Sequence, residues 1–306
     1  MKTLILFIAL LIVLLFYIPP IIAEAIPSDQ RAVMIKSWAL PVPGNQDSNF
    51  AITSSFSGNE IYFVDSSANK IGRLIPQTNT ITYWDLPTAN SFPTSIEYTP
   101  SGSIYYIDSN SNKIGRLVPE TNTITEWNLP SNSSSNSTVG NNSGINDNIR
   151  QLSSLSVDAS TGSVYFVESN TNKIGRLAPE TNTITEWTIQ SNGTRVQSMT
   201  LGFGGNEIYF VDSSANKIGR LAPTTNLITQ WDLPTANSFP TSVKFDPSTG
   251  SVYFVESNTN KIGRLLPFYN EFTEWSLQEK PYNIEIDSSG SLHYIVENGT
   301  KIVRMD

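Results

Sequence analysis

The 306-residue sequence contains no cysteine, one histidine (His293), and fewer basic than acidic residues, with 19 Lys and Arg against 27 Asp and Glu. Without cysteine the fold depends on no disulfide, and a cysteine nucleophile is excluded. A single histidine excludes a histidine-rich zinc site. A Ser-His-Asp triad would have to use His293. A net charge of −8 provides no basic surface for phosphates, so nucleic acid is not an expected partner.

A 16-residue motif, residues 172–187 (NKIGRLAPETNTITEW), recurs along the chain. The segment Lys-Ile-Gly-Arg-Leu begins at Lys70, Lys113, Lys173, Lys217 and Lys261, and a tryptophan follows each copy at Trp84, Trp127, Trp187, Trp231 and Trp275. Most copies are 43 or 44 residues apart. That period is typical of a four-stranded propeller blade, so the sequence predicts an all-β propeller with four-stranded antiparallel blades.

Each repeat contains four short runs of strand-forming residues, called here strands a to d. In the second repeat they cover residues 95–98, 103–107, 113–118 and 123–129. Alternation in strand d places Trp127 and Leu129 on one face, which we expect to pack against the neighbouring blade. Gly175 lies inside strand c, where glycine weakens a sheet, and this indicates a close neighbour. We expect a tryptophan of the adjacent sheet there.

The repeats also give the number of blades. Five complete copies cover residues 50–86, 95–129, 152–189, 197–233 and 241–277, and a sixth begins at Tyr282 but ends before its strand d. The sixth tryptophan, Trp38, lies in residues 33–41, which read like a strand d. We therefore predict a six-bladed propeller, closed by an N-terminal strand that completes the last blade and protects both sheet edges. A monomer is expected.

The N-terminus is predicted to direct export. Residues 1–25 contain Lys2, an apolar run and an Ala-Glu-Ala sequence, as in a cleaved signal peptide. The alternative is a membrane anchor formed by residues 4–22, which would be the protein's contact with a membrane. Residues 26–306 then form one propeller domain of a secreted protein, with a disordered Ser/Asn-rich insertion at 131–147. Five sequons make it a glycoprotein candidate: Asn132, Asn136, Asn141, Asn192 and Asn298.

Antiparallel strands place the d-to-a and b-to-c loops on one face, called here the long-loop face, where we expect binding. Strand b ends in an acid in five repeats, at Asp65, Asp108, Glu168, Asp212 and Glu256. Such a ring of carboxylates could bind Mg²⁺ or Ca²⁺. The alternative, which we favour, is that each acid accepts N–H bonds from its own turn. His293 stands where the other repeats have tyrosine, and we interpret it as a packing position.

The repeat Ile-Tyr-Phe-Val-Asp/Glu-x-x-x-Asn-Lys-Ile-Gly-Arg-Leu, continuing to Ile-Thr-Glu-Trp-x-Leu-Pro, resembles the streptogramin (virginiamycin B) lyase family, which has NHL-like repeats. The resemblance implies a propeller, usually of seven blades, and a Mg-dependent lyase that opens the lactone of a cyclic depsipeptide by elimination. It also implies catalytic histidines just before strand a. The matching positions of this chain hold Thr94, Thr241 and Tyr282.

We therefore predict a binding or interaction module whose ligand contacts Thr94, Thr241 and Tyr282. The partner would be a small molecule, a glycan or a protein on the long-loop face. One alternative is a lyase with a rebuilt site, in which Tyr282 acts with Glu256 or Glu297 and a divalent cation. A second alternative, from fold analogy, is a gluconolactonase-like calcium-dependent hydrolase.

Overall fold

A computed structural model of the protein describes residues 51–55, 57–130, 151–190, 195–286, 290–296 and 302–305. The chain divides into two units, Met1–Pro41 and Val42–Asp306, and the second is described below. Several predictions lie outside the described residues: the signal segment 1–25, the strand with Trp38, the insertion 131–147, Glu297 and the five sequons. In the part of the chain that is described, no helix is long and apolar enough to cross a membrane.

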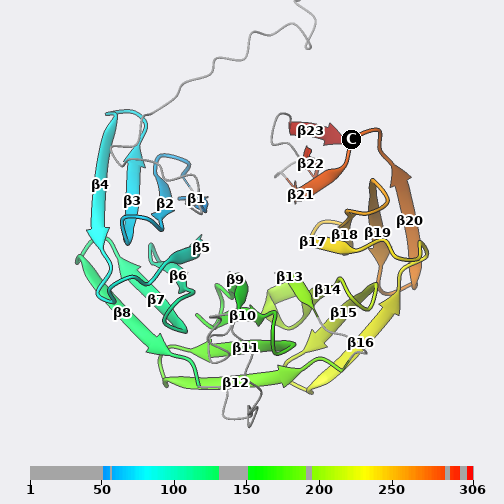
Figure 1. Ribbon diagram of the computed structural model, residues 1–306, viewed down its shortest axis with the longest axis horizontal. Coiled ribbons are helices and arrows are strands. Elements are labelled where there is room, and N and C mark those ends of the chain that lie inside the picture. Colours follow the sequence, from blue (N-terminus) through cyan, green and yellow to red (C-terminus); the bar gives the residue numbers. More distant parts are fainter. Residues whose placement is uncertain are drawn as a thin grey trace, which may run out of the picture. The chain divides into compact units, whose positions relative to one another are not determined.

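The described strands form six antiparallel sheets, in which consecutive strands are hydrogen-bonded neighbours. The six sheets (blades 1 to 6) comprise β1 to β4 (Ile52–Ser54, Ile61–Asp65, Lys70–Ile75, Thr80–Asp85), β5 to β8 (Pro93–Tyr98, Ile104–Asp108, Lys113–Val118, Thr123–Asn128), β9 to β12 (Leu152–Val157, Val164–Glu168, Lys173–Ala178, Thr183–Thr188), β13 to β16 (Val196–Leu201, Ile208–Asp212, Lys217–Ala222, Leu227–Asp232), β17 to β20 (Pro240–Asp246, Ser251–Glu256, Lys261–Leu266, Glu271–Ser276) and β21 to β23 (Pro281–Ile286, Leu292–Val296, Ile302–Met305). In Figure 1 the blades follow one another in chain order, with β5, β9, β13 and β17 on the inner side and β8, β12, β16 and β20 on the outer side.

The all-β class and the four-stranded antiparallel sheets are confirmed. Blade 6 has three strands among the described residues. Its completion by the N-terminal strand, and hence closure of the ring, stays a prediction.

The turns explain why these short strands end where they do. Asparagine with a φ of 51–60° closes the b-to-c and c-to-d turns of blades 1 to 5. Asparagine tolerates this left-handed conformation better than other residues with a side chain, and it hydrogen-bonds locally. The positions are Asn69, Asn79, Asn112, Asn122, Asn172, Asn182, Asn216, Asn226, Asn260 and Asn270.

The glycine inside strand c has a close neighbour, but the neighbour is not the one predicted. Gly175 pairs with Phe166 of strand b in the same sheet, and a Cβ on Gly175 would lie 2.1 Å from the Phe166 ring. Gly72, Gly115, Gly219 and Gly263 lie in the same way under the ring of a strand b Phe or Tyr. The prediction that a tryptophan of the adjacent sheet lies there is wrong, because strand b presents its own aromatic residue directly opposite the glycine.

Tryptophan instead joins consecutive blades, as the alternation in strand d predicted. Trp84 and Leu86 of blade 1 pack in one buried cluster with Ile96 and Tyr106 of blade 2, and equivalent clusters join the later blades. In blades 1 to 4 the indole Nε1–H also donates to an asparagine Oδ1 in the c-to-d turn of the next blade, at 2.7–2.8 Å. The pairs are Trp84 with Asn122, Trp127 with Asn182, Trp187 with Asn226, and Trp231 with Asn270. Apolar burial and a directional bond therefore both fix the blade contact.

Candidate functional site at the long-loop face

The d-to-a and b-to-c segments lie on one face, as predicted. In the connection from blade 1 to blade 2, the Leu86 N–H donates to the Asn69 carbonyl of blade 1. At the other end of this connection, Asn110 N–H donates to the Ser91 carbonyl. The connection is thus hydrogen-bonded to a b-to-c turn on each side, which places strand a's first residues at the rim of the face.

Strand a begins with a β-bulge in blades 2 to 6. The register shifts by one residue between the first and third positions, so that the second residue has no partner on strand b. The bulged residues are Thr94, Ser153, Gln197, Thr241 and Tyr282. All three predicted ligand-binding positions are among them. A bulge redirects a side chain at a sheet end and is frequent beside functional sites.

Two of the three predicted residues are already hydrogen-bonded. Thr94 Oγ1 lies 2.6 Å from Ser109 Oγ, and Thr241 Oγ1 lies 2.6 Å from Ser257 Oγ. Tyr282 is 64% exposed. Ser109 and Ser257 directly follow the acids at the ends of their strands b, so the bulge and the strand b terminus form one hydroxyl-lined rim.

The five predicted metal ligands are buried, and each carboxylate accepts a bond from its own b-to-c turn. Asp65 accepts from the Ala68 N–H at 2.9 Å, and Asp212 accepts from the Ala215 N–H at 3.0 Å. The others accept from the backbone of Ser111 or from the hydroxyls of Thr171 and Thr259. The described residues contain no group of three or more His, Asp or Glu side chains placed to hold a metal ion. Whether Mg²⁺ or Ca²⁺ binds stays a prediction.

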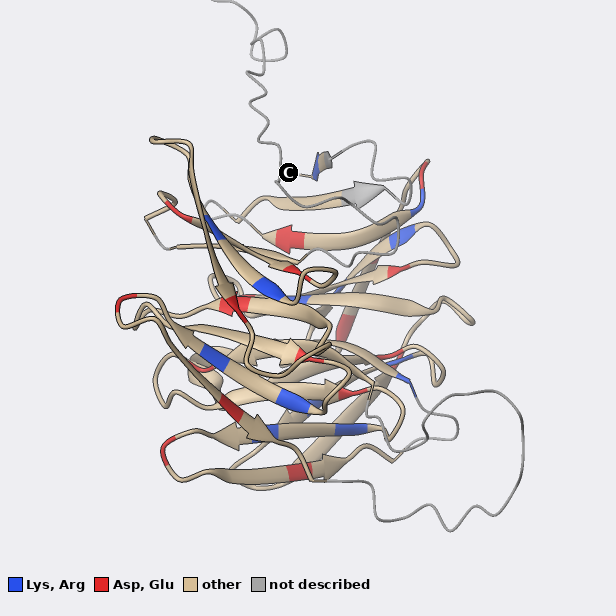
Figure 2. Ribbon diagram, turned by 60° about the vertical axis from the view of Figure 1, so that its left-hand side comes forward, with Lys and Arg blue, Asp and Glu red and all other residues tan. Residues whose placement is uncertain are grey.

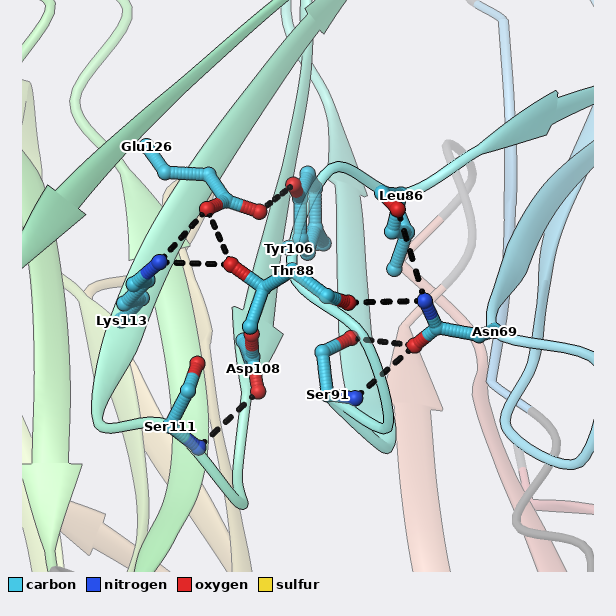
Figure 3. A network of polar contacts seen from close by, with 9 residues as sticks. All are labelled: Asn69, Leu86, Thr88, Ser91, Tyr106, Asp108, Ser111, Lys113 and Glu126. Carbon is cyan, nitrogen blue, oxygen red and sulfur yellow. Dashed lines mark hydrogen bonds and ion pairs between the residues drawn. The ribbon is translucent and has the colours of Figure 1, made fainter.

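Behind the rim of blade 2, a polar network fixes the incoming connection (Figure 3). Glu126 Oε2 accepts from Thr88 Oγ1 at 2.6 Å and from Lys113 Nζ at 2.9 Å, and its Oε1 accepts from Tyr106 Oη at 3.1 Å. Asn69 reaches the same connection from blade 1, with its Oδ1 accepting from the N–H and Oγ of Ser91. The connection is thereby held from both blades.

Blade 5 repeats this network because the sequence Leu-Pro-Thr-Ala-Asn-Ser-Phe-Pro-Thr-Ser occurs at both 86–95 and 233–242. Thr235 Oγ1 donates to Glu274 at 2.6 Å, and Lys261 binds Glu274 at 2.8 Å. Phe92 and Phe239 have φ values of 57° and 54°. This conformation is unfavourable for an aromatic residue, and such strain persists where the surroundings impose it.

Charge and burial shift several pKa values near this face. Burial raises the pKa of Glu256 to about 7, and the neighbouring Glu274 carboxylate adds to the effect. Burial also raises the pKa of Asp108. Burial opposes the ionisation of Glu126 too, but hydrogen bonds from Thr88 and Lys113 outweigh it and lower the Glu126 pKa. Figure 2 shows acidic and basic positions interspersed over the described strands, in keeping with such local pairing.

Further along strand a, the inner strands carry charged residues that sequence analysis missed. At the position paired with the strand b tyrosine or with His293, the residues are Thr53, Glu97, Ser156, Thr200, Lys244 and Glu285. Glu97 Oε1 accepts from the Val157 N–H at 3.0 Å, and Lys244 binds Glu285. An alignment of the six strands a would have revealed that Glu97, Lys244 and Glu285 replace the small hydroxyl residues of the other blades. His293 occupies the tyrosine position, as predicted.

Blades of four antiparallel strands, joined through their faces and lined by bulged inner strands, define a β-propeller. The family model for the virginiamycin B lyase family matches residues 156–306. No curated protein matches the sequence significantly.

Solved structures give a similar result over most of the chain. Selenomethionine-substituted virginiamycin B lyase from Staphylococcus aureus is 25% identical, covering 86% of this chain and 82% of its own, with a TM-score of 0.71. A catalytically inactive His-to-Ala variant of virginiamycin B lyase from Staphylococcus aureus, with quinupristin, is 26% identical with the same coverage and TM-score. A streptogramin B lyase is 24% identical, covering 87% of this chain and 85% of its own, with a TM-score of 0.69. The chain is thus a streptogramin lyase-like β-propeller.

Proposed function

We propose that this protein is a ligand-binding propeller that holds a polar ligand on its long-loop face without breaking a covalent bond. The observation that carries the proposal is the hydroxyl pairing at the bulges. Where the resemblance places catalytic histidines, Thr94 and Thr241 stand, and each lies 2.6 Å from a serine hydroxyl. A hydroxyl donates and accepts hydrogen bonds but does not take up a proton near neutral pH, as the base in an elimination must.

The rim offers chemistry suited to binding. Hydroxyls at the bulges, the exposed Tyr282 and the exposed Asn90 and Asn237 supply donors, acceptors and one aromatic face. The duplicated networks hold the 86–91 and 233–238 connections rigid, so little conformational entropy is lost when a ligand binds. A small polar molecule or a glycan fits this chemistry best, and a protein partner would use the same groups.

A lyase activity is the alternative, and one observation favours it. The pKa of Glu256, raised to about 7 by burial and by Glu274, is in the range where a general base works best. Its side chain is 0% exposed, however, so a substrate would reach it only after the rim at Thr241 had opened.

Quinupristin, present in the similar lyase structure, is a suitable first probe. We expect calorimetry to detect binding, and chromatography to show the depsipeptide ring intact after incubation with Mg²⁺. Thr241→Val should weaken binding by about tenfold because it removes a rim hydroxyl, whereas Thr225→Val, on an exposed c-to-d turn, should not. Ring opening would establish the lyase alternative. If neither quinupristin nor any glycan on an array bound, the binding proposal would be overturned.

We further propose that the protein is exported after cleavage of residues 1–25 and that residues 33–41 complete blade 6. The blade contact repeated four times supports the second proposal, since Trp38 would meet the c-to-d turn of blade 1 at Asn79. Deleting residues 26–41 should then lower the melting temperature by more than about 5 °C. An unchanged melting temperature would refute closure, and the intact mass of the secreted protein tests cleavage.

A further inference from the structure

A cavity of about 390 Å³ opens among the inner strands, beginning just beyond the bulges of the long-loop face. Its lining comes from β1, β17, β21 and β22, and consists of Ile52, Lys244, Asn283, Ile284, Glu285, His293 and Tyr294. Lys244 and Glu285 lie four residues beyond the prolines that begin their strands, Pro240 and Pro281. The cavity volume is within the range of small-molecule sites.

The polar side of this cavity carries groups of both charges. Lys244 Nζ lies 2.7 Å from one oxygen of Glu285 and 3.1 Å from the other. The two side chains are 37% and 67% exposed, so neither charge is sealed from a ligand. Asn283 Oδ1 accepts from Ser242 and from the Ile284 N–H, which leaves the Asn283 amide NH₂ as a donor at the cavity.

The other side of the cavity is apolar. Ile284 and Tyr294 are buried, whereas Ile52 is 72% exposed, which is unusual for an isoleucine in a strand. A ligand with an aliphatic group would cover Ile52 and remove apolar surface from water. The cavity therefore combines an apolar wall with one cationic and one anionic group.

The surrounding charges suit a ligand that carries both signs. Glu97, on blade 2, interacts electrostatically with both Lys244 and Glu285 and is therefore near the pair. Burial raises the pKa of Glu97 to about 7. A purely anionic ligand would meet the carboxyl groups of Glu97 and Glu285. A purely cationic ligand would take Glu285 from Lys244 and leave the Lys244 ammonium without its partner.

We propose that this cavity binds a free α-amino acid with an aliphatic side chain. The ligand carboxylate contacts Lys244 and the Asn283 amide, the ligand ammonium contacts Glu285, and the aliphatic group covers Ile52. Lys244 thus exchanges the Glu285 carboxylate for the ligand carboxylate, and Glu285 exchanges the Lys244 ammonium for the ligand ammonium. Neither member of the pair is left without an opposite charge. This site uses none of the rim residues Thr94, Thr241 and Tyr282, although Asn283 adjoins Tyr282 in the chain.

Calorimetric titration of the full chain with L-leucine tests the proposal, with L-leucinamide and N-acetyl-L-leucine as probes that lack one charge each. We expect L-leucine to bind with a dissociation constant of about 1 mM or below, and each derivative to bind at least about tenfold more weakly. Lys244→Met and Glu285→Gln should each weaken binding by at least about tenfold, because each removes one charge-assisted contact. Lys217→Met is the matched control, since Lys217 forms an exposed ion pair with Asp232 on outer strands.

Absence of heat with L-leucine at a concentration about 20 times the expected dissociation constant would overturn the proposal. Equal affinity for the three probes, or unchanged affinity in Lys244→Met, would overturn it too. Circular dichroism of each variant establishes that it is folded. If Lys244→Met unfolds, the isosteric Glu285→Gln decides the outcome. Failure here is distinct from failure at the rim, because quinupristin binding and its loss in Thr241→Val are measured separately.

Discussion

Substituting alanine for Gly175 tests whether the glycine of strand c is required by the aromatic ring opposite. The new Cβ would lie 2.1, 2.3 and 2.7 Å from three atoms of the Phe166 ring, whereas ordinary contacts begin near 3.4 Å. Phe166 is 0% exposed and packs in the cluster between blades 2 and 3, so it has no free space to move into. Overpacking of this kind typically costs about 1–3 kcal/mol.

The expected loss is in the upper part of that range, about 2–3 kcal/mol, because the ring must move by more than an ångström. Replacing glycine also reduces the entropy of the unfolded chain, which offsets about 0.5–1 kcal/mol. Urea unfolding followed by tryptophan fluorescence measures the difference. Gly162→Ala is a useful comparison, since its φ of +67° is strained for alanine but nothing lies within 4 Å of the new Cβ.

A second substitution isolates the cause. In a Phe166→Leu background the outer ring atoms are gone, so adding Gly175→Ala should cost less than about 0.5 kcal/mol or stabilise the protein. If Gly175→Ala costs the same in both backgrounds, or if it is neutral in the wild type, the reasoning about the ring is refuted.

Three other predictions concern blade contacts and titrating groups. Trp187→Phe keeps an aromatic ring but removes the 2.7 Å bond to Asn226, and should lower the free energy of unfolding by about 1 kcal/mol in urea; no loss would mean that the bond is only incidental to packing. The pKa of Glu126 is lowered in the folded state by Thr88 and Lys113, in spite of burial, so its contribution is present above the unfolded pKa and is lost as pH falls through the folded value. The stability difference between wild type and Glu126→Gln should therefore shrink below about pH 4. The pKa of Glu97 is raised to about 7 by burial, so the wild type should lose stability relative to Glu97→Gln as pH rises from about 4 to 7, and a parallel pH dependence would contradict this.

Much of the fold could be predicted because the chain repeats itself. Strand c of blade 2 is predicted at its observed bounds, 113–118, since a lysine and a Pro-x-x-Asn turn mark its ends. Strand a of the same blade begins at Pro93, two residues before the predicted start. The bulge at Thr94 causes this difference, because it interrupts the alternation by which a strand is recognised.

The candidate sites were predictable only in part. Thr94 and Thr241 follow from the resemblance, because their place in the repeat is fixed by the neighbouring proline. Lys244, Glu285 and Glu97 come from three blades, and each alone reads as an ordinary surface charge. Only the arrangement of the inner strands in space brings them together, and no periodicity within one repeat contains that information.

The blade contact has a further consequence for how the protein folds. The inter-blade hydrogen bonds from Trp84 to Asn122 and from the Val157 N–H to Glu97 join residues 38 and 60 positions apart, and the other indole bonds are intermediate. Each blade therefore depends on its immediate neighbours, as in linear repeat proteins, whose stability is a sum of unit and nearest-neighbour terms. A substitution such as Trp187→Phe should weaken one junction of the chain, and hydrogen exchange should quicken first in the two blades that share it.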